Sequence, residues 1–244
     1  IGMTQRDAIR DRRRKKQQQQ RMVVIMIVAG IALIAVAIIM VPTIMRNFQT
    51  VGEFTKPEVN PRTMANGNTM GDPNAPVVIE EFSDFGCNHC ANFAFGTAEL
   101  IEEEYITNGQ VFFVSRSTGN LLNNPNTQLA AEAAYCAADQ EMYWEYSDLI
   151  YANQGLLFFG GVSYIDNYLN AFADTLDLDM NTFEDCLSKG KHEERVLNDG
   201  NDARLAGINS TPSFLINGTL VRGNLPFPEF QVHIDGALEI SSSQ

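Results

Sequence analysis

The stretch that decides the fold is residues 77–90, VVIEEFSDFGCNHC. Its apolar start, residues 77–79, predicts a buried strand. A short turn then leads to Cys87 and Cys90, and residues 91–105, rich in Ala, Glu, Leu and Phe, predict a helix. The order strand, turn, Cys-x-x-Cys, helix is the setting of a redox-active cysteine pair.

The spacing of the two cysteines predicts different roles for them. A thiol reacts only as its thiolate, and a helix N-terminus lowers a cysteine pKa to roughly 3.5–7.5 because backbone N–H groups and the helix dipole stabilise the anion. We expect Cys87 to be the exposed nucleophile and Cys90, one turn into the helix, to be shielded. His89 favours the thiolate as a cation or a donor. Stabilising the reduced form strengthens the disulfide as an oxidant, so the pattern favours donation of disulfides.

A zinc or copper site is the main alternative for such a pair. Structural zinc takes four ligands, and His192 and His233 do not form a second ligand pair by spacing. Covalent haem attachment needs a histidine directly after the second cysteine, where the chain has Ala91. We therefore expect no metal and no cofactor, with a metal-binding domain kept as an alternative.

Two consecutive acids, Glu80 and Glu81, lie near the end of the predicted strand. Successive strand side chains point to opposite faces, so one points inward and the other outward. Both could be solvated acids at a sheet edge. Alternatively, one lies beneath the cysteines with a raised pKa and exchanges the proton of Cys90 through water. The pattern alone does not choose between them.

Residues 22–45 contain no charged side chain, and residues 22–41 are almost wholly apolar. Twenty helical residues span about 30 Å, the thickness of the hydrocarbon core of a bilayer. A cleaved signal peptide has a shorter apolar region of roughly 7–15 residues, and residues 41–45, VPTIM, make a poor cleavage site. The segment predicts a transmembrane anchor over 22–45, with a buried core helix as the alternative.

Charge is divided unevenly along the chain. Residues 1–46 hold nine Lys/Arg and two acids, a net charge of +7. Because the whole chain has a net charge of −13, residues 47–244 have a net charge of −20. The run at 12–16, RRRKK, could bind nucleic acid, but the apolar segment after it identifies residues 1–21 as a cytoplasmic membrane flank. The acidic remainder then lies outside, where disulfides persist, and is a poor candidate for binding nucleic acid.

After a predicted linker over 46–76, rich in Asn, Pro, Gly and Thr, the globular domain spans 77–244. Its expected class is α/β, with a small mixed sheet and a helical insertion at about 120–200. The predicted strands are residues 77–82, 111–115, 213–217 and 219–221. The predicted later helices are residues 128–153, 162–176, 181–187, 193–205 and 228–239.

Three tracts resemble the DsbA-like group of thioredoxin-fold proteins. They are residues 71–90, GDPNAPVVIEEFSDFGCNHC; residues 207–218, GINSTPSFLING; and the helical middle, residues 130–154. The resemblance covers the chain from about residue 71 to the C-terminus, and the paired motifs at its two ends are specific. It implies a thioredoxin fold with a helical insertion.

The resemblance also implies roles for single residues. Cys87 corresponds to the attacking cysteine and Cys90 to the resolving one, which together form the redox disulfide. Glu81, six residues before Cys87, falls at the buried acid of the family and is favoured over its neighbour. Thr211-Pro212 corresponds to the loop whose proline is cis and whose backbone can pair with a substrate peptide. A plain strand start is the alternative for this dipeptide.

Cys136 and Cys186 lie in the predicted insertion. Some relatives have a second disulfide there, so the resemblance implies a structural bridge, with two buried unpaired thiols as the alternative. Closing a loop of this length contributes up to ~4 kcal/mol in the chain-entropy model. The sequence departs from the family at Asn88, where relatives have a proline, and this change bears on the redox potential.

Together these features predict a membrane-tethered, extracytoplasmic thiol–disulfide oxidoreductase. The expected direction is oxidase, with reduced cysteine-containing envelope proteins as substrates and a membrane quinone-linked thiol oxidase as the recycling partner. The alternatives are a reductase or isomerase of the same fold, or a non-catalytic domain that binds envelope proteins or metals.

Overall fold

The computed structural model describes residues 5–47, 51–58, 61–62, 64–119, 121, 124–162 and 164–243, and the side chains of the first helix only from residue 14 to 41. The chain divides into two compact units, Ile1–Thr50 and Val51–Gln244, which are described separately. The ends of the predicted basic segment, linker and insertion that fall on residues 1–4, 48–50, 59, 60, 63, 120, 122 and 123 lie outside the described residues.

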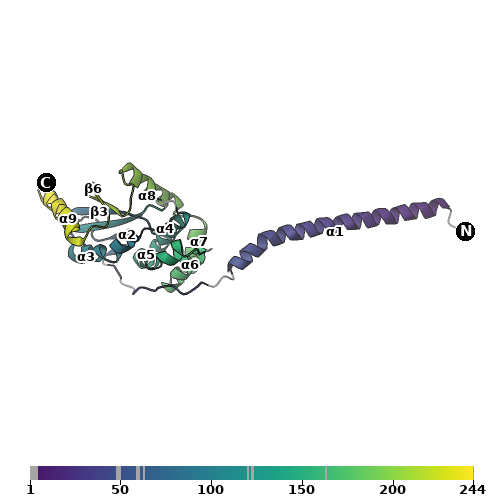
Figure 1. Cartoon of the computed structure of the whole chain (residues 1–244), viewed down its shortest axis with the longest axis horizontal. Helices are drawn as coiled ribbons and strands as arrows, with labels where there is room; N and C mark the ends of the chain where they lie inside the picture. The colour runs from purple at the N-terminus through teal and green to yellow at the C-terminus, as the bar shows by residue number, and fades with distance from the viewer. Residues whose placement is uncertain are drawn as a thin grey trace. The chain divides into compact units, whose positions relative to one another are not determined.

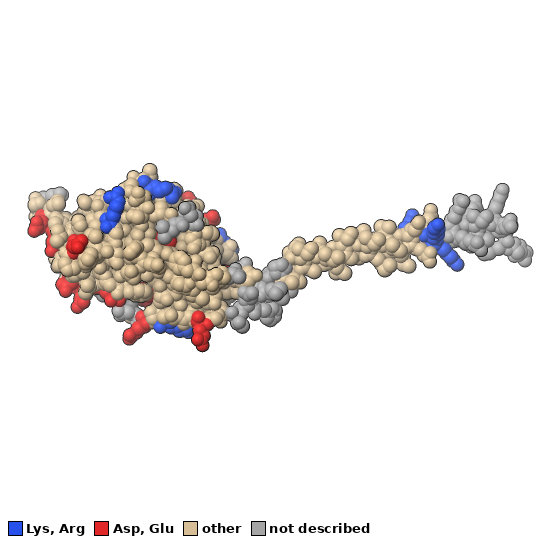
Figure 2. Space-filling model, in the orientation of Figure 1, with Lys and Arg blue, Asp and Glu red and all other residues tan. Residues whose placement is uncertain are grey.

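The first unit is one long helix, α1 (Gln5–Asn47). Within it, Arg14–Val41 is long and apolar enough to cross a membrane. Figure 2 shows the Lys and Arg side chains at the N-terminal end of the described part of this helix, with uncharged side chains beyond them. The predicted anchor over 22–45 lies inside α1, which also continues back through the basic segment without a break.

The second unit is built on a mixed sheet that has six strands in the described residues, in the order β1-β2-β4-β3-β5-β6 (Figure 1). Its centre is the parallel pair β3 (Val77–Ser83) and β4 (Val111–Ser117). The antiparallel hairpin β5 (Ser213–Ile216) and β6 (Thr219–Arg222) continues the sheet beyond β3. Strands from the two ends of the domain therefore lie side by side.

The helices divide between the sheet and a separate helical region (Figure 1). Those that accompany the sheet are α2 (Asn88–Ala94), α3 (Thr97–Ile101), η1 (Glu102–Ile106) and α9 (Phe227–Ser242). The helical region consists of α4 (Pro125–Ala138), α5 (Tyr143–Ala152), η2 (Gly155–Phe159), α6 (Ile165–Thr175) and α7 (Met180–Ser188). The helix that follows, α8 (Glu193–Leu205), contacts both α4 and the sheet. Together these helices form the predicted insertion between β4 and β5.

Helix α2 lies where two hydrophobic cores meet. Its residues Cys87 and Cys90 pack in the core of the helical region, while Phe93, one turn further, packs in the core of the sheet. Phe93 contacts the rings of Phe113 and Phe214 from β4 and β5. The cysteine pair is thereby held on a helix that both cores fix in place.

Parts of the predicted linker over 46–76 are attached to the globular domain. The short strands β1 (Ala65–Asn66) and β2 (Thr69–Met70) form a hairpin that pairs with β4. Further upstream, the backbone of Thr55 exchanges two hydrogen bonds with the Asn153 side chain, and Phe54 packs against Phe172. The segment is polar in composition, but its backbone groups and one aromatic ring find partners on the domain.

Two predicted helices are also divided. The helix expected over 91–105 breaks between α2 and α3 at Gly96, whose backbone does not have helical dihedral angles. The helix expected over 128–153 is interrupted between α4 and α5, where Glu141 adopts a positive φ of 62°. Each break lets the following segment turn to cover a different part of the core.

Candidate active site

Cys87 and Cys90 lie at the N-terminus of α2 as free thiols. Cys87 occupies the N-cap position, and its carbonyl oxygen accepts hydrogen bonds from the amides of Cys90 and Ala91, at 3.1 and 3.2 Å. Cys90 is fully buried, whereas Cys87 retains 8% of its surface. The expected ranking of exposure holds, but Cys87 itself is more enclosed than predicted because the insertion covers much of it.

The surroundings of Cys87 favour its thiolate. A hydrogen bond from the Cys90 thiol is the largest cause that lowers the pKa of Cys87 to about 5, against the opposing effect of burial. Hydrogen bonds from Thr211 and from the backbone amides of Cys90 and His89 lower it further. The cysteine is therefore ionised at neutral pH and ready to leave or to attack.

Cys90 behaves in the opposite way. Burial raises its pKa well above the ordinary value, and the nearby charge of the Cys87 thiolate adds to the effect. The pair thus holds one proton and one negative charge, with the charge on the sulfur that keeps contact with the surface. This asymmetry distinguishes a nucleophile from a resolving thiol.

Thr211 and Pro212 complete the site from the other end of the domain, and the peptide bond between them is cis. The Cys87 sulfur lies 3.3 Å from the carbonyl oxygen of Thr211, to which it donates a hydrogen bond in its thiol form. The Thr211 hydroxyl is buried and has no hydrogen-bond partner among the described residues in the dithiol state. It is therefore available to the Cys87 thiolate, in keeping with the lowered pKa.

The two adjacent acids on β3 point to different environments. Glu80 pairs with Arg116 at 3.0 Å, whereas Glu81 is 5% exposed and lies within the protein. Burial raises the pKa of Glu81 to about 8, although a hydrogen bond from the Ser115 hydroxyl opposes the shift. Glu81 therefore carries a proton at neutral pH, beneath the cysteine pair.

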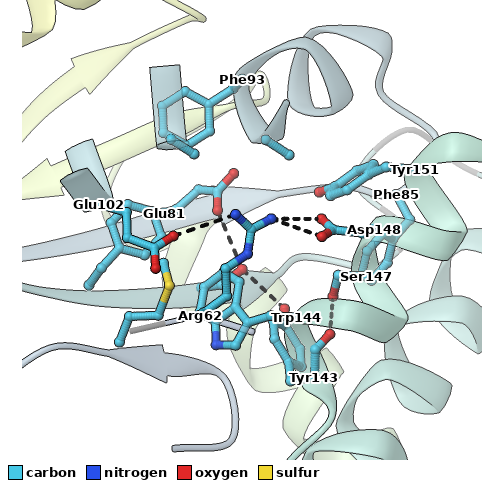
Figure 3. Close-up of a pocket in the computed structure, with 15 residues that line it drawn as sticks. Arg62, Glu81, Phe85, Phe93, Glu102, Tyr143, Trp144, Ser147, Asp148 and Tyr151 are labelled. Carbon is cyan, nitrogen blue, oxygen red and sulfur yellow. Dashed lines mark hydrogen bonds and ion pairs between the residues drawn. The ribbon is translucent and has the colours of Figure 1, made fainter. Parts of the chain in front are cut away.

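A narrow cavity extends from Glu81 (Figure 3). Its volume is about 30 Å³, and Phe85, Phe93, Phe113 and Trp144 are among the residues that line it. Two polar groups of side chains also line it. One is Glu81 with Ser115, and the other is the ion-paired cluster of Arg62, Glu102 and Asp148.

Gln154 is a site residue that the sequence did not reveal. Its Nε2 donates hydrogen bonds to the carbonyl oxygens of Phe85 and Cys87, at 2.5 and 3.0 Å. It thereby ties the turn before α2 to the insertion. Gln154 was visible only as one polar residue at the end of a predicted helix, with no spacing relation to the cysteines.

The two loop residues between the cysteines, Asn88 and His89, are both exposed. The backbone amide of His89 contributes to stabilising the Cys87 thiolate. The amide group supplies this contact, so a direct role for the imidazole stays a prediction.

Cys136 of α4 and Cys186 of α7 form a disulfide in the insertion, with their Cα atoms 5.9 Å apart. His192 lies close to both sulfurs, so the three side chains have the spacing of a metal cluster. A bonded disulfide offers no thiolate ligand, however, and thiolate is the form of cysteine that binds metals. In this state the cluster does not fit a metal site.

Fold and site together define a thioredoxin-fold domain with a Cys-x-x-Cys pair at a helix N-terminus, facing a cis-proline loop. A family model described as thioredoxin matches residues 63–236. The chain therefore belongs to the thioredoxin family.

Solved structures place the fold within that family more closely. The chain superposes on alpha-DsbA1 of Wolbachia pipientis with a TM-score of 0.64 and 23% identity, covering 73% of this chain and 94% of that one. For oxidised BdbD of Bacillus subtilis the TM-score is 0.62 at 20% identity, covering 74% and 97%. The predicted DsbA-like thioredoxin fold with a helical insertion is confirmed.

Curated relatives fall into two groups. The chain is 34% identical over 158 residues to Na(+)/H(+) antiporter NhaA 1 of Salinispora arenicola, which covers 64% of this chain and 22% of the antiporter. It is 27% identical over 172 residues to probable disulfide bond formation protein D of Bacillus anthracis, covering 70% and 78%. The chain thus spans about a fifth of the antiporters it matches.

Proposed function

We propose that the Val51–Gln244 unit is an enzyme, a protein thiol–disulfide oxidoreductase that donates disulfides. The observation that carries the proposal is the asymmetry of the pair, in which the pKa of Cys87 is lowered to about 5 and that of Cys90 is raised. A DsbA-like fold and a relative described as a probable disulfide bond formation protein support the same class of reaction.

The reaction starts from the oxidised pair. A substrate thiolate attacks the sulfur of Cys87, a mixed disulfide forms, and Cys90 leaves and takes up a proton. A second substrate thiolate then attacks the substrate sulfur of the mixed disulfide and releases Cys87 as a thiolate. The substrate loses two electrons and gains a disulfide, and the enzyme gains the electrons as a dithiol.

Each site residue has a part in these steps. Glu81 is the proton donor for Cys90, through water, because it holds a proton at neutral pH and lies beneath the pair. Thr211 and the cis Pro212 offer a backbone edge for an extended substrate segment, as in strand addition. Asn88 and His89, both exposed, are positioned to contact that segment.

The stabilised thiolate favours the oxidase direction. A thiol with a low pKa is a good leaving group, and its stabilisation in the dithiol makes the disulfide more oxidising. The substrates are reduced, cysteine-containing envelope proteins. Because each turnover leaves the pair reduced, a membrane quinone-linked thiol oxidase has to restore the disulfide.

Helix α1 serves as a single-pass anchor in this proposal, with residues 1–21 in the cytoplasm and the catalytic unit outside. The length and apolar composition of Arg14–Val41 support an anchor, and the basic flank supports this orientation. Similarity to part of a sodium–proton antiporter, by its name a membrane protein, agrees with a place at the membrane.

The test is a redox titration of the full chain combined with oxidative refolding of a reduced substrate protein. We expect a potential nearer to the about −120 mV of DsbA than to the about −270 mV of thioredoxin, with catalysed refolding. A thioredoxin-like potential without oxidase activity would reverse the direction and identify a reductase or isomerase.

A Cys87→Ser variant separates catalysis from binding. The enzyme proposal requires that this variant lose all refolding activity, while Cys90→Ala should accumulate a mixed disulfide with substrate. Partner binding and phenotype that survive in Cys87→Ser would identify a non-catalytic protein-binding domain instead.

A further inference from the structure

Arg62 has no part in the disulfide exchange itself, yet it lines the same cavity as Glu81 (Figure 3). One guanidinium nitrogen contacts both carboxylate oxygens of Asp148, at 2.8 and 3.1 Å, and the other contacts Glu102 at 3.4 Å. Asp148 belongs to α5 of the insertion, and Glu102 to η1 beside the sheet. Arg62 itself comes from the segment before the first strand, so three separate parts of the chain meet here.

The charged cluster keeps only a small contact with solvent. The side chains of Arg62, Asp148 and Glu102 are 8, 11 and 14% exposed. All three line the cavity together with Glu81 and several apolar and aromatic side chains. The ion-paired Arg62 is therefore part of the wall between this cavity and bulk water.

The cavity is suited to hold water. A water molecule needs roughly 10–15 Å³ of such space together with polar partners, and the cavity offers about 30 Å³. Glu81 and Ser115 supply polar partners. In addition, Arg62 Nε is buried without a hydrogen-bond partner among the described residues, and the Arg62 side chain lines the cavity.

We propose that Arg62 is a positioning residue that shields this cavity from solvent, so that the proton exchanged between Glu81 and Cys90 travels through enclosed rather than bulk water. The proposal rests on the proposed function, because Glu81 acts as a proton carrier only if the cysteine pair exchanges disulfides. Arg62 touches neither sulfur and acts through the enclosure of Glu81.

Arg62 could act on Glu81 through its charge or through the exclusion of water, and the groups around the cavity indicate which effect is larger. The titratable and charged groups on the elements packed around the cavity are Cys87, Cys90, Tyr143, Tyr151, Arg62, Glu102, Asp148, Glu99 and Glu145. Burial is the largest cause of the raised pKa of Glu81. The charge of Arg62 is balanced locally by Asp148 and Glu102. We therefore expect the enclosure to matter more than the charge.

The experiment compares Arg62→Ala with Arg62→Met in the reduced, full-length chain held in lipid nanodiscs. Alanine removes both the plug and the charge, whereas methionine removes the charge but keeps most of the side-chain length. The carboxyl band of Glu81 is followed by infrared titration and identified by its loss in Glu81→Gln. In Arg62→Ala, we expect the Glu81 midpoint to fall by about one pH unit or more, as hydration relieves desolvation. In Arg62→Met, which keeps the enclosure but leaves Asp148 and Glu102 without their cation, the midpoint should not fall below that of wild type.

Equal midpoints in wild type and Arg62→Ala would overturn the proposal. A similar shift in both variants would assign the effect to charge, which also overturns it. The titration uses no substrate, so it can fail while disulfide donation stands, and the Cys87→Ser refolding assay can fail without moving the midpoint.

A kinetic readout distinguishes positioning from general stability. The rate at which Cys90 resolves a preformed mixed disulfide should follow the Glu81 midpoint in its pH profile, and this profile should move to lower pH in Arg62→Ala but not in Arg62→Met. If Arg62 only stabilised the fold, its replacement would lower the resolution rate in both variants at every pH without moving the pH profile. That result would reduce Arg62 to a structural contact.

Discussion

The sulfur of Cys87 lies 3.3 Å from the carbonyl oxygen of Thr211 and, in its thiol form, donates a hydrogen bond to it, although 124 residues separate the two in sequence. The contact is possible because β3, which leads to Cys87, pairs with β5, which follows Pro212. The redox site is therefore assembled only when the two ends of the domain pair, with the whole insertion lying between them in the chain.

Replacing Cys90 should raise the pKa of Cys87. The hydrogen bond from Cys90 is the largest cause of the low value of about 5, so in Cys90→Ala we expect the midpoint of Cys87 ionisation to rise by about one pH unit or more. The measurement is the pH dependence of alkylation by iodoacetamide. Cys90→Ser keeps a hydroxyl donor and should shift the midpoint less, and equal shifts in the two variants would contradict the assigned cause.

Glu81 should make the protein less stable as pH rises. The native carboxyl holds its proton up to about pH 8, whereas an unfolded one releases it near its ordinary value of 4.5. Between these values the native state binds more protons, so the free energy of unfolding falls with pH, by an amount on the order of 5 kcal/mol. In Glu81→Gln this loss disappears.

The comparison of Glu81→Gln with wild type measures the effect of the carboxyl, because both proteins keep Cys87 and the variant lacks only the group that titrates. Thermal unfolding of the reduced proteins should give similar midpoints near pH 4.5 and a higher midpoint for the variant near pH 9. A variant that is no more stable than wild type at the higher pH would show that ionising Glu81 inside the protein costs no free energy of folding.

Gln154 should be required for the geometry of the turn before α2. Its amide donates to the carbonyl oxygens of Phe85 and Cys87. Gln154→Glu has the same shape without the donor, so we expect two unsatisfied carbonyl groups and a loss of about 1–3 kcal/mol in the free energy of unfolding. Denaturant unfolding measures the loss. Gln154→Asn, whose amide is one methylene shorter, tests whether reach matters, and unchanged stability in the Glu variant would exclude the role.

Removing the disulfide of the insertion should reduce stability but leave the redox chemistry intact. The bridge joins residues 50 positions apart, and closing such a loop is worth up to ~4 kcal/mol in the chain-entropy model. We expect Cys136→Ala/Cys186→Ala to unfold at lower denaturant concentration. Its Cys87 alkylation midpoint should equal that of wild type, and a shifted midpoint would mean that the bridge also shapes the active site.

The sequence pattern predicted the elements that carry strong local signals. The helix over 193–205 matches α8 in both bounds, and the Asn217-Gly218 turn connects β5 to β6 as expected. The hairpin of β1 and β2 was missed because strands of two residues have no periodicity. Their partner is β4, and the amide of Ser115 donates to the carbonyl oxygen of Asn68 in the turn between them.

The site residues that could be predicted were those near the cysteines in sequence and, through the family resemblance alone, Thr211 and Pro212. Alternation along β3 predicted that Glu80 and Glu81 face opposite ways, but only the family resemblance selected Glu81 as the buried acid. Arg62 and Gln154 carry no motif, and each reaches the site through contacts across the fold. Such residues become visible only when the packing of the insertion against the sheet is known.

The attachment of the segment before the first strand to the domain has a consequence for proteolysis. Thr55 is bound to Asn153, and Arg62 forms part of the wall of the Glu81 cavity. A protease that cut the chain just before residue 51 would release a domain with its acid–base chemistry unchanged. If Arg62 encloses Glu81 as proposed, a cut between residues 62 and 77 would release one whose buried acid is open to water. The position of the cut, rather than release itself, would then decide whether the freed domain keeps the chemistry of the full chain.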